Sequence, residues 1–255
     1  MLMESWRTAL VSAGDGSIRI QGYPVAALME RSFADVVFLL HRGKLPTAAE
    51  RRLLDAILVA SADHGSGAPS CAAARLAASG NRQSLSAAVA AGVLAIGDEH
   101  GGAGETCMEW IAAGVERARR EDANLCDTTS RVVSESKAAG IRIPGLGHRV
   151  HSLDPRTGVL FNMARAHGLA ADGVVYMEAL ASAVAAQIKP LALNIDGALA
   201  AILFDLGFPP PAGKLLFIIG RVAGLTAEVY EEHTREKPMR IRIPVEYDGV
   251  PPREL

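Results

Sequence analysis

The 255-residue chain has little cysteine and few aromatic residues. Phenylalanine, tryptophan and tyrosine make up 5% of it, and the three cysteines, Cys71, Cys107 and Cys126, have no Cys-x-x-Cys spacing. An odd, scattered set of cysteines argues against a disulfide framework or a zinc site and is typical of reduced thiols. The N-terminal residues also lack the apolar segment of a signal peptide. We therefore expect a cytoplasmic protein.

An excess of one charge and a long apolar run are also missing. Lysine and arginine number 26 against 28 aspartate and glutamate residues, which gives a net charge of −2 and no electrostatic footprint for nucleic acid. The most apolar stretch, residues 179–208, is interrupted by Lys189, Asp196 and Asp205. A membrane span needs about 20 nearly uncharged residues. We therefore expect a buried helix pair there, and neither nucleic acid nor a membrane as partner.

Several signatures of catalytic or cofactor sites are absent as well. No Gly-x-Ser-x-Gly follows a strand pattern, and no β–α–β units indicate a dinucleotide-binding fold. His148 and His151 are three residues apart, but no His-Glu-x-x-His motif or histidine and cysteine cluster accompanies them. We therefore expect no metal site.

Helical patterns dominate the chain. "TAAE" (residues 47–50) is a capping box at a helix start, and Pro24 and Gly43 are placed to begin and end one helix. Further helices are expected at about 69–79, 83–96, 104–120, 123–139, 156–167, 173–188, 196–206 and 213–233. Strand-like alternation occurs in "GSIRIQGY" (16–23) and "MRIRIPVEY" (239–247). The sequence predicts an all-α fold with extended terminal arms.

Four segments between the expected helices combine polar side chains with glycine or proline. They are "SADHGSGAPS" (61–70), "GDEHGGAGE" (97–105), "IPGLGHRV" (143–150) and "LNIDGA" (193–198). Helix ends present backbone amides and partial charges that bind anions. The candidate functional residues in these segments are His64, His100, His148 and Asp196. Structural roles remain open for them, since a loop histidine can be structural and Asp196 can be a helix N-cap.

Taken in this order, the four segments resemble the motifs of the citrate synthase superfamily. The resemblance covers essentially the whole chain and includes "FIIGRVAGLTAEVYEE" (217–232), which is similar to a helix that carries a substrate-binding arginine. "IGDEHGGA" and "NIDGALAAILFDLG" are closer to citryl-CoA lyases and to the C-terminal module of ATP citrate lyase than to respiratory citrate synthases. The latter usually have His-Glu-x-Asn where this chain has His64-Gly65-Ser66-Gly67.

The resemblance implies a fold and an activity. The fold is a large helical domain, residues 1–104 and 206–255, with a smaller inserted helical domain, 105–205, that carries a mobile loop and the aspartate. The activity is to make or break the carbon–carbon bond between an acetyl-CoA enolate and oxaloacetate, with a coenzyme A thioester as substrate. Cleavage of citryl-CoA is favoured. The alternatives are a citrate or 2-methylcitrate synthase and a non-catalytic, CoA-binding regulatory paralogue.

The resemblance also implies roles for single residues. Asp196 exchanges the proton at carbon, and His100 donates to the thioester oxygen. His148 donates a proton to the carbonyl oxygen of the oxo acid, which becomes an alkoxide in the reaction. The substrate-binding residues are His64, Arg156, Arg221 and, from a neighbouring subunit, Arg242, with Arg240 as its rival. The coenzyme A contacts are Pro144, Gly145, Gly147 and Arg149. An arginine that crosses between subunits implies a homodimer or a dimer of dimers.

Overall fold

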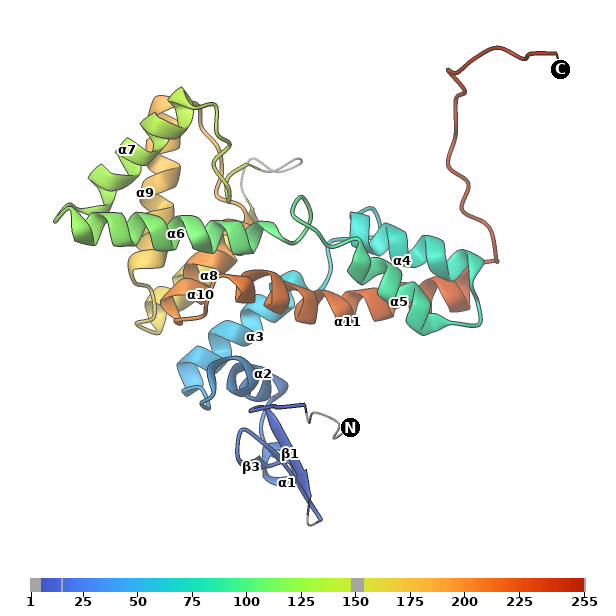
Figure 1. Cartoon of the computed structure of the whole chain (residues 1–255), viewed down its shortest axis with the longest axis horizontal. Coiled ribbons are helices and arrows are strands. Elements are labelled where there is room, and N and C mark those ends of the chain that lie inside the picture. Colours follow the sequence, from blue (N-terminus) through green and yellow to red (C-terminus); the bar gives the residue numbers. More distant parts are fainter. Residues whose placement is uncertain (1–5, 15, 148–153, 255) are drawn as a thin grey trace, which may run out of the picture.

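A computed structural model of the chain describes residues 6–14, 16–147 and 154–254, and Figure 1 shows it. Three short strands form one antiparallel sheet in the order β1 (Val11–Gly14), β2 (Ser17–Ile20) and β3 (Tyr23–Pro24). The helices in the described residues are α1 (Val25–Leu28), α2 (Phe33–Arg42), α3 (Ala48–Ala62), α4 (Pro69–Gly80), α5 (Leu85–Leu94), α6 (Ala103–Arg120), α7 (Leu125–Ala138), α8 (Pro155–Ala166), α9 (Asp172–Gln187), α10 (Ile195–Asp205) and α11 (Pro211–Arg235). The predicted all-α class is confirmed.

Side-chain caps explain where several helices begin. The predicted capping box starts α3, where the Thr47 hydroxyl accepts from the Glu50 amide at 3.2 Å. The single helix expected between Pro24 and Gly43 is wrong, because a second box divides it into α1 and α2. There the Ser32 hydroxyl accepts from the Asp35 amide at 3.2 Å, and the Asp35 carboxylate accepts from the Ser32 amide at 3.1 Å. Such a box satisfies two backbone amides that have no intrahelical acceptor at a helix start, and a continuous helix would not need these side-chain acceptors.

The two terminal strand patterns have different outcomes. The N-terminal pattern forms β2 and β3, with β1 added before it from residues outside the predicted range. The C-terminal pattern, residues 239–247, is extended and exposed but forms no strand in the described chain. Figure 1 shows this segment running away from the helices, where no neighbouring strand of the same chain lies beside it. A strand requires such a partner.

The core lies where the long helices cross. The main apolar cluster includes α3, α6, α9 and α10, and a smaller cluster joins α4 and α5 to the second half of α11. The apolar stretch 179–208 supplies the end of α9 and all of α10, as the buried helix pair predicted for it. The main cluster includes residues from both expected domains, and the boundaries at 104/105 and 205/206 stay a prediction. No helix in the described part of the chain is long and apolar enough to span a bilayer.

Candidate active site

A tight turn places His100 immediately before α6. The Gly97 amide donates to the His100 carbonyl and the His100 amide donates to the Gly97 carbonyl, both at 3.0 Å. Gly101 has a φ of +81°, and a Cβ there would lie 2.3 Å from the Phe217 ring. The glycine after His100 is therefore required by backbone geometry and by the approach of α11.

Contacts with Ser70 set the orientation of the half-buried His100 ring. Its Nε2 lies 2.8 Å from the Ser70 hydroxyl and 3.3 Å from the Ser70 amide. Since a backbone N–H can only donate, Nε2 is the acceptor and the proton of the neutral ring is on Nδ1. The Phe217 ring packs edge-on against the imidazole, with centroids 6.3 Å apart. His100 is thus held as an N–H donor through Nδ1.

Arg221 is the buried centre of the contacts around Ser70. Its guanidinium donates to the Ser70 hydroxyl at 3.1 Å and to the Ser61 carbonyl at 2.9 Å. It also lies over the Phe217 ring, 4.9 Å from the centroid, and only 2% of the residue is exposed. Because the Ser70 hydroxyl accepts from Arg221, it donates its own proton to Nε2 of His100. This supports the assignment of the ring proton to Nδ1. Ser70 was not among the residues predicted from the sequence, where its only signal was its place at a helix start.

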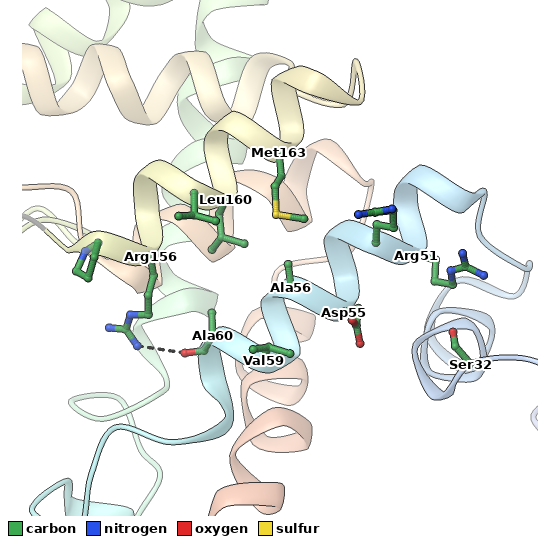
Figure 2. A pocket seen from close by; sticks show the side chains of 12 residues that line it. Ser32, Arg51, Asp55, Ala56, Val59, Ala60, Arg156, Leu160 and Met163 are labelled. Carbon is green, nitrogen blue, oxygen red and sulfur yellow. Dashed lines mark hydrogen bonds between the residues drawn. The ribbon is translucent and has the colours of Figure 1, made fainter.

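The loop that carries His64 is fixed at both ends by the same arginine. His64 is exposed and lies between α3 and α4. Arg221 donates to Ser61 before this loop and to Ser70 after it. Arg156 reaches the same place, because its Nη1 donates to the Ala60 carbonyl at 3.1 Å (Figure 2). Two guanidiniums therefore bind successive carbonyls at the C-terminal end of α3, beside His64.

Arg156 is also bound by its own helix cap. Its Nε and Nη2 donate to the two oxygens of Asp154, at 3.0 and 2.8 Å, and Asp154 is buried. A pocket of about 630 Å³ lies between α3 and α8 (Figure 2). Arg156 is the one predicted site residue among the described residues that line it. Because none of the other predicted residues that the structure describes lines it, this pocket is not the centre of the predicted site.

Asp196 lies in the first turn of α10. The N-cap of this helix is Asn194, whose side chain accepts from the Gly197 amide at 3.1 Å, so the N-cap role considered for Asp196 is wrong. A carboxylate in a first turn is stabilised by the helix dipole. Burial, and second the charge of Asp196, raise the pKa of the Cys107 thiol. Since Cys107 lies in the second turn of α6, the helix that follows His100, Asp196 and His100 are at neighbouring helix starts.

The glycine-rich segment before His148 is bound to the residues before Asp196. The Gly147 amide donates to the Ala192 carbonyl at 2.7 Å, and Asn194 donates to the carbonyls of Gly145 and Gly147 at 3.1 and 3.0 Å. Gly145 is buried, has a φ of +77°, and would place a Cβ 2.9 Å from the Gly197 Cα. Neither this packing role of Gly145 nor the bridging by Asn194 was predicted from the sequence, where the signal of Asn194 was its cap position in "NIDG".

The remaining predicted residues lie at the edges of the described structure. His148 and Arg149 fall outside the described residues. Pro144 is half-buried, and Arg242 is exposed in the C-terminal segment. Arg240 is bound to Glu232 of α11, with its Nε 3.0 Å from Oε1. The described structure therefore brings together His100, Arg221 and the loops or helix starts that carry His64 and Asp196, and leaves Arg242 apart from them.

One group of possible metal ligands is present among the described residues. A carboxylate oxygen of Asp63, the Cys71 thiol and a carboxylate oxygen of Glu228 lie within 4.8 Å of one another. Glu228 is ion-paired with Arg75, and burial raises the pKa of the Cys71 thiol. A metal would need the thiolate and would compete with the arginine, so this group has the features of a structural cluster.

Comparison with known proteins places this geometry in a family. The family model of the citrate synthase C-terminal domain matches residues 47–242, and the chain therefore belongs to the citrate synthase family. The chain is similar to citryl-CoA lyase from Hydrogenobacter thermophilus, with 42% identity and a TM-score of 0.90 over 99% of this chain and 98% of that one. The predicted family is confirmed.

More distant relatives share the fold. ATP citrate lyase from Methanosaeta concilii, in complex with (3S)-citryl-CoA, has a TM-score of 0.78 and 21% identity over 96% of this chain and 42% of that chain. Citrate synthase from Heyndrickxia coagulans is 27% identical over 86% of this chain. The chain spans 57% of the length of that citrate synthase, and 38% of an ATP-citrate synthase beta chain from Arabidopsis thaliana.

Proposed function

We propose that the chain is a citryl-CoA lyase, an enzyme that cleaves citryl-CoA into acetyl-CoA and oxaloacetate. The observation that carries the proposal is the 42% identity to a citryl-CoA lyase along almost the whole of both chains. The citrate synthase of Heyndrickxia coagulans reaches 27%, and the chain spans 57% of its length. The two chains also share their fold over almost their whole length, with a TM-score of 0.90.

The proposed cleavage reverses an enolate addition. A base, for which the family pattern supplies His148, takes the proton of the tertiary hydroxyl, and the bond between the two reacting carbons breaks as the ketone of oxaloacetate forms. The released electron pair becomes the enolate of acetyl-CoA. His100 donates from Nδ1 to the enolate oxygen, and the protonated carboxyl of Asp196 delivers a proton to the enolate carbon.

The described geometry supports these roles. Ser70 accepts from Arg221 and donates to Nε2 of His100, which makes Nδ1 the ring nitrogen that carries the proton. Arg156 and Arg221 meet at the C-terminal end of α3, where the carboxylates of the substrate would bind as bidentate partners. Preorganised donors of this kind act on charge that develops in the transition state.

Coenzyme A and a second subunit complete the proposed site. Pro144, Gly147 and Arg149 remain the proposed contacts of coenzyme A, while buried Gly145 acts through packing. An ATP citrate lyase from Methanothrix soehngenii with this fold binds citrate and coenzyme A. For the arginine that crosses to a neighbour we propose Arg242, because Arg240 is bound to its own α11. The chain then functions as a homodimer.

Synthetic citryl-CoA tests the proposal. A lyase forms oxaloacetate, which is measured by its reduction coupled to NADH oxidation, while the thioester survives and no free thiol is released. A citrate synthase, the second candidate from the family match, instead releases citrate and free coenzyme A, which a thiol reagent detects. Binding of coenzyme A without turnover would favour the regulatory paralogue. Either of these results contradicts the lyase assignment.

A further inference from the structure

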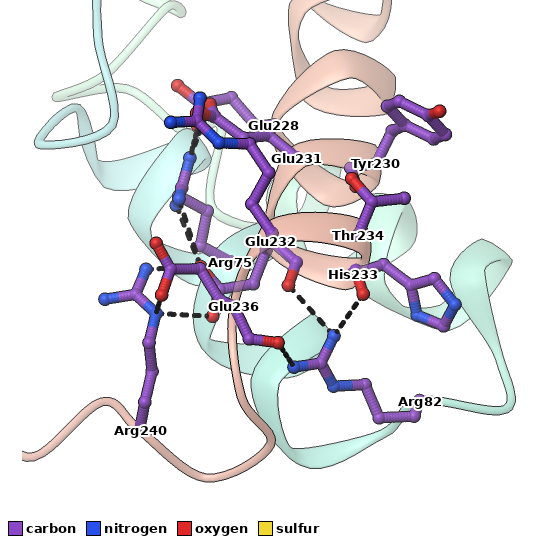
Figure 3. A network of polar contacts seen from close by, with 11 residues as sticks. Arg75, Arg82, Glu228, Tyr230, Glu231, Glu232, His233, Thr234, Glu236 and Arg240 are labelled. Carbon is purple, nitrogen blue, oxygen red and sulfur yellow. Dashed lines mark hydrogen bonds and ion pairs between the residues drawn. The ribbon is translucent and has the colours of Figure 1, made fainter.

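The C-terminal end of α11 carries a polar network that the proposed mechanism does not use (Figure 3). We call it the arm anchor and define it by Arg75, Arg82, Glu232 and Arg240. Arg75 lies on α4, Arg82 follows α4, Glu232 lies on α11, and Arg240 lies in the extended C-terminal segment. The network thus joins three separate parts of the chain.

Glu232 is the centre of the arm anchor. It has no exposed surface, and its carboxylate receives two arginines. Arg75 donates through Nε at 3.2 Å, and Arg240 donates through Nε at 3.0 Å and through Nη2 at 2.5 Å. A buried carboxylate is tolerated only when it is paired and hydrogen-bonded. The ion pairs therefore bind the C-terminal segment to the packed helices α4 and α11.

Arg82 caps the C-terminal end of α11. Its guanidinium donates to the carbonyls of Glu232, His233 and Glu236, at 2.9, 2.8 and 2.6 Å. These are carbonyls that a helix terminus leaves without intrahelical partners. The Met239 amide also donates to the Ser79 carbonyl at 3.0 Å. Residues 236–240 are consequently fixed on the end of α4, and the chain leaves this point in a set direction.

The segment that follows has a composition suited to contact with another chain. Ile243, Val245 and Tyr247 occupy alternate positions and are 69%, 88% and 76% exposed. Alternation of this kind places apolar side chains on one face of an extended strand. Figure 1 shows that the segment extends away from its own helices. A second copy of this chain is the occupant that the proposed crossing of Arg242 requires, because residues beyond Arg242 must then lie on the neighbour.

We propose that Glu232 is a positioning residue for the neighbouring active site. By holding Arg75 and Arg240 together it fixes where the arm leaves the helices, and so delivers Arg242 to the substrate bound by a second copy. Residues 243–247 pack their apolar face on that copy. The proposal rests on the proposed function, which assigns Arg242 to substrate binding.

Two variants test the anchor in the full-length protein. Arg240→Ala frees the arm and leaves Glu232 paired with Arg75, and Glu232→Gln weakens both pairs. If one arm in ten keeps the productive direction, KM for citryl-CoA rises about tenfold. We expect kcat to remain within about twofold. The matched control is Arg235→Ala, which removes an exposed arginine, paired with Glu231 at 2.5 Å, from the same helix end. An unchanged KM in both anchor variants overturns the proposal.

The two variants also separate positioning from direct binding. If Arg240 were itself the arginine that binds substrate, Arg240→Ala would raise KM and Glu232→Gln would not. Hydrogen exchange of residues 238–247 adds a readout that needs no catalysis. Faster exchange of this segment in both anchor variants, with α11 still protected, is expected. This readout distinguishes a failed anchor from a failed lyase assignment.

Hybrid dimers test delivery between subunits. A chain with His100→Ala is co-expressed with a chain that carries Arg242→Ala, and the hybrid is purified with two different tags. The one complete site then takes Arg242 from the His100→Ala chain. Adding Arg240→Ala to that chain should raise KM about tenfold, whereas adding it to the other chain should not. Equal effects in both placements, or full activity in a monomer, contradict the proposal.

Discussion

At the scale of single residues, the site depends on a relay from a buried charge to an imidazole. Arg221 donates to the Ser70 hydroxyl, and the hydroxyl faces Nε2 of His100 at 2.8 Å. The relay fixes both the plane of the ring and the nitrogen that carries its proton. A histidine that donates to an enolate oxygen needs its ring plane and its protonated nitrogen to be fixed before the substrate binds.

The relay predicts the effect of removing its central hydroxyl. Ser70→Ala should lower kcat/KM for citryl-CoA by about 10- to 100-fold, because supporting partners of functional groups have effects of this size. Steady-state kinetics on the purified variant provide the measurement. The matched control is Ser79→Ala, a buried serine on the same helix whose hydroxyl has no partner among the described residues. Equal losses in both variants would assign Ser70 to folding alone.

Asp196 leads to a second prediction at this scale. Asp196→Ala removes the group that we propose exchanges a proton with carbon, so kcat should fall by about 10²–10⁴. The same loss is expected for His148→Ala. Circular dichroism and thermal melting should show an unchanged fold, because Asp196 is a half-buried residue of the first turn and Asn194 supplies the cap. Near-normal turnover by either variant would remove that residue from the mechanism.

The residue types of the site could be predicted from the sequence, but their network could not. His64, His100 and Asp196 stand out because polar groups beside glycines interrupt apolar segments. Ser70 does not stand out, because its partners His100 and Arg221 are 30 and 151 residues away along the chain. Only the packing of α4 against α11 brings them together, and no local pattern reports it.

At the scale of elements, glycine positions hold the helix starts together. Gly145 contacts the N-terminal turn of α10 and the side of α6, where Cys107 lies. Gly147 has a similar positive φ, +87°, but a Cβ there would meet only a side-chain atom of Leu191, at 3.9 Å. Substitutions at the two glycines therefore separate the free-energy cost of a left-handed backbone conformation from the cost of a steric collision.

Alanine substitutions at these glycines should differ in their effect on stability. Gly147→Ala adds left-handed strain of about 1–2 kcal/mol. Gly145→Ala adds the same strain and a collision with Gly197 and Cys107, worth about 1–3 kcal/mol more. Urea unfolding of both variants measures the difference. Equal free energies of unfolding would show that the close contact of the loop with α10 is not maintained in solution.

Tyr176 gives a prediction for the contact between α6 and α9. Its hydroxyl is buried, has no hydrogen-bond partner among the described residues, and lies against Gly114. Burial raises the pKa of Tyr176 to about 12. Because an unfolded tyrosine has a pKa of about 10, the stability linked to this group is complete below pH 10 and is lost as the pH rises toward 12.

Tyr176→Phe should remove this alkaline loss of stability. At neutral pH the variant should be as stable as the wild type or about 1 kcal/mol more stable, because an unsatisfied buried hydroxyl is gone. Unfolding free energies at pH 7 and pH 10.5 test both statements. Tyr230→Phe, at a residue 67% exposed, is the control and should leave the pH dependence unchanged. Identical pH profiles for Tyr176→Phe and wild type would contradict the buried hydroxyl.

Helix positions were predictable along most of the chain, since α4 to α11 each begin and end within about two residues of the ranges predicted from periodicity. Pro24 and Gly43 fit the ends of one helix, so the pattern predicted α1 and α2 as a single element although Ser32 and Asp35 form a capping box between them. A strand was predicted at residues 239–247 because the alternation is real. Strands form only with a partner, and a single chain supplies none there.

At the scale of the whole molecule, α11 connects the site to the terminal arm. Its middle carries Arg221 beside His100, and its end carries the arm anchor around Glu232. One helix thus contacts the His100 side of the candidate site and also holds the segment that carries Arg242, which we propose reaches a neighbouring subunit. Sequence resemblance suggests that an arginine crosses between subunits, and the ion pair of Arg240 with Glu232 is the observation that favours Arg242 in our proposal.

Truncations of the arm test this arrangement. Ending the chain after Arg240 removes the half-buried Ile241 and the exposed residues 242–254, so we expect the melting temperature to change little while KM for citryl-CoA rises about 30-fold or more. The control ends after Asp248, so it keeps Arg242 and the apolar side chains of Ile243, Val245 and Tyr247. It should retain full activity. Normal kinetics in the shorter chain would exclude Arg242 from substrate binding.

The most direct test of the central claim is cleavage of citryl-CoA in D₂O with the acetyl-CoA product isolated at early times. Protonation of an enolate carbon by Asp196, whose carboxyl proton exchanges with solvent, predicts one deuterium in the acetyl methyl group of each product molecule. Oxaloacetate should form in equal amount. Formation of citrate and free coenzyme A, without labelled acetyl-CoA, would contradict the lyase and its enolate.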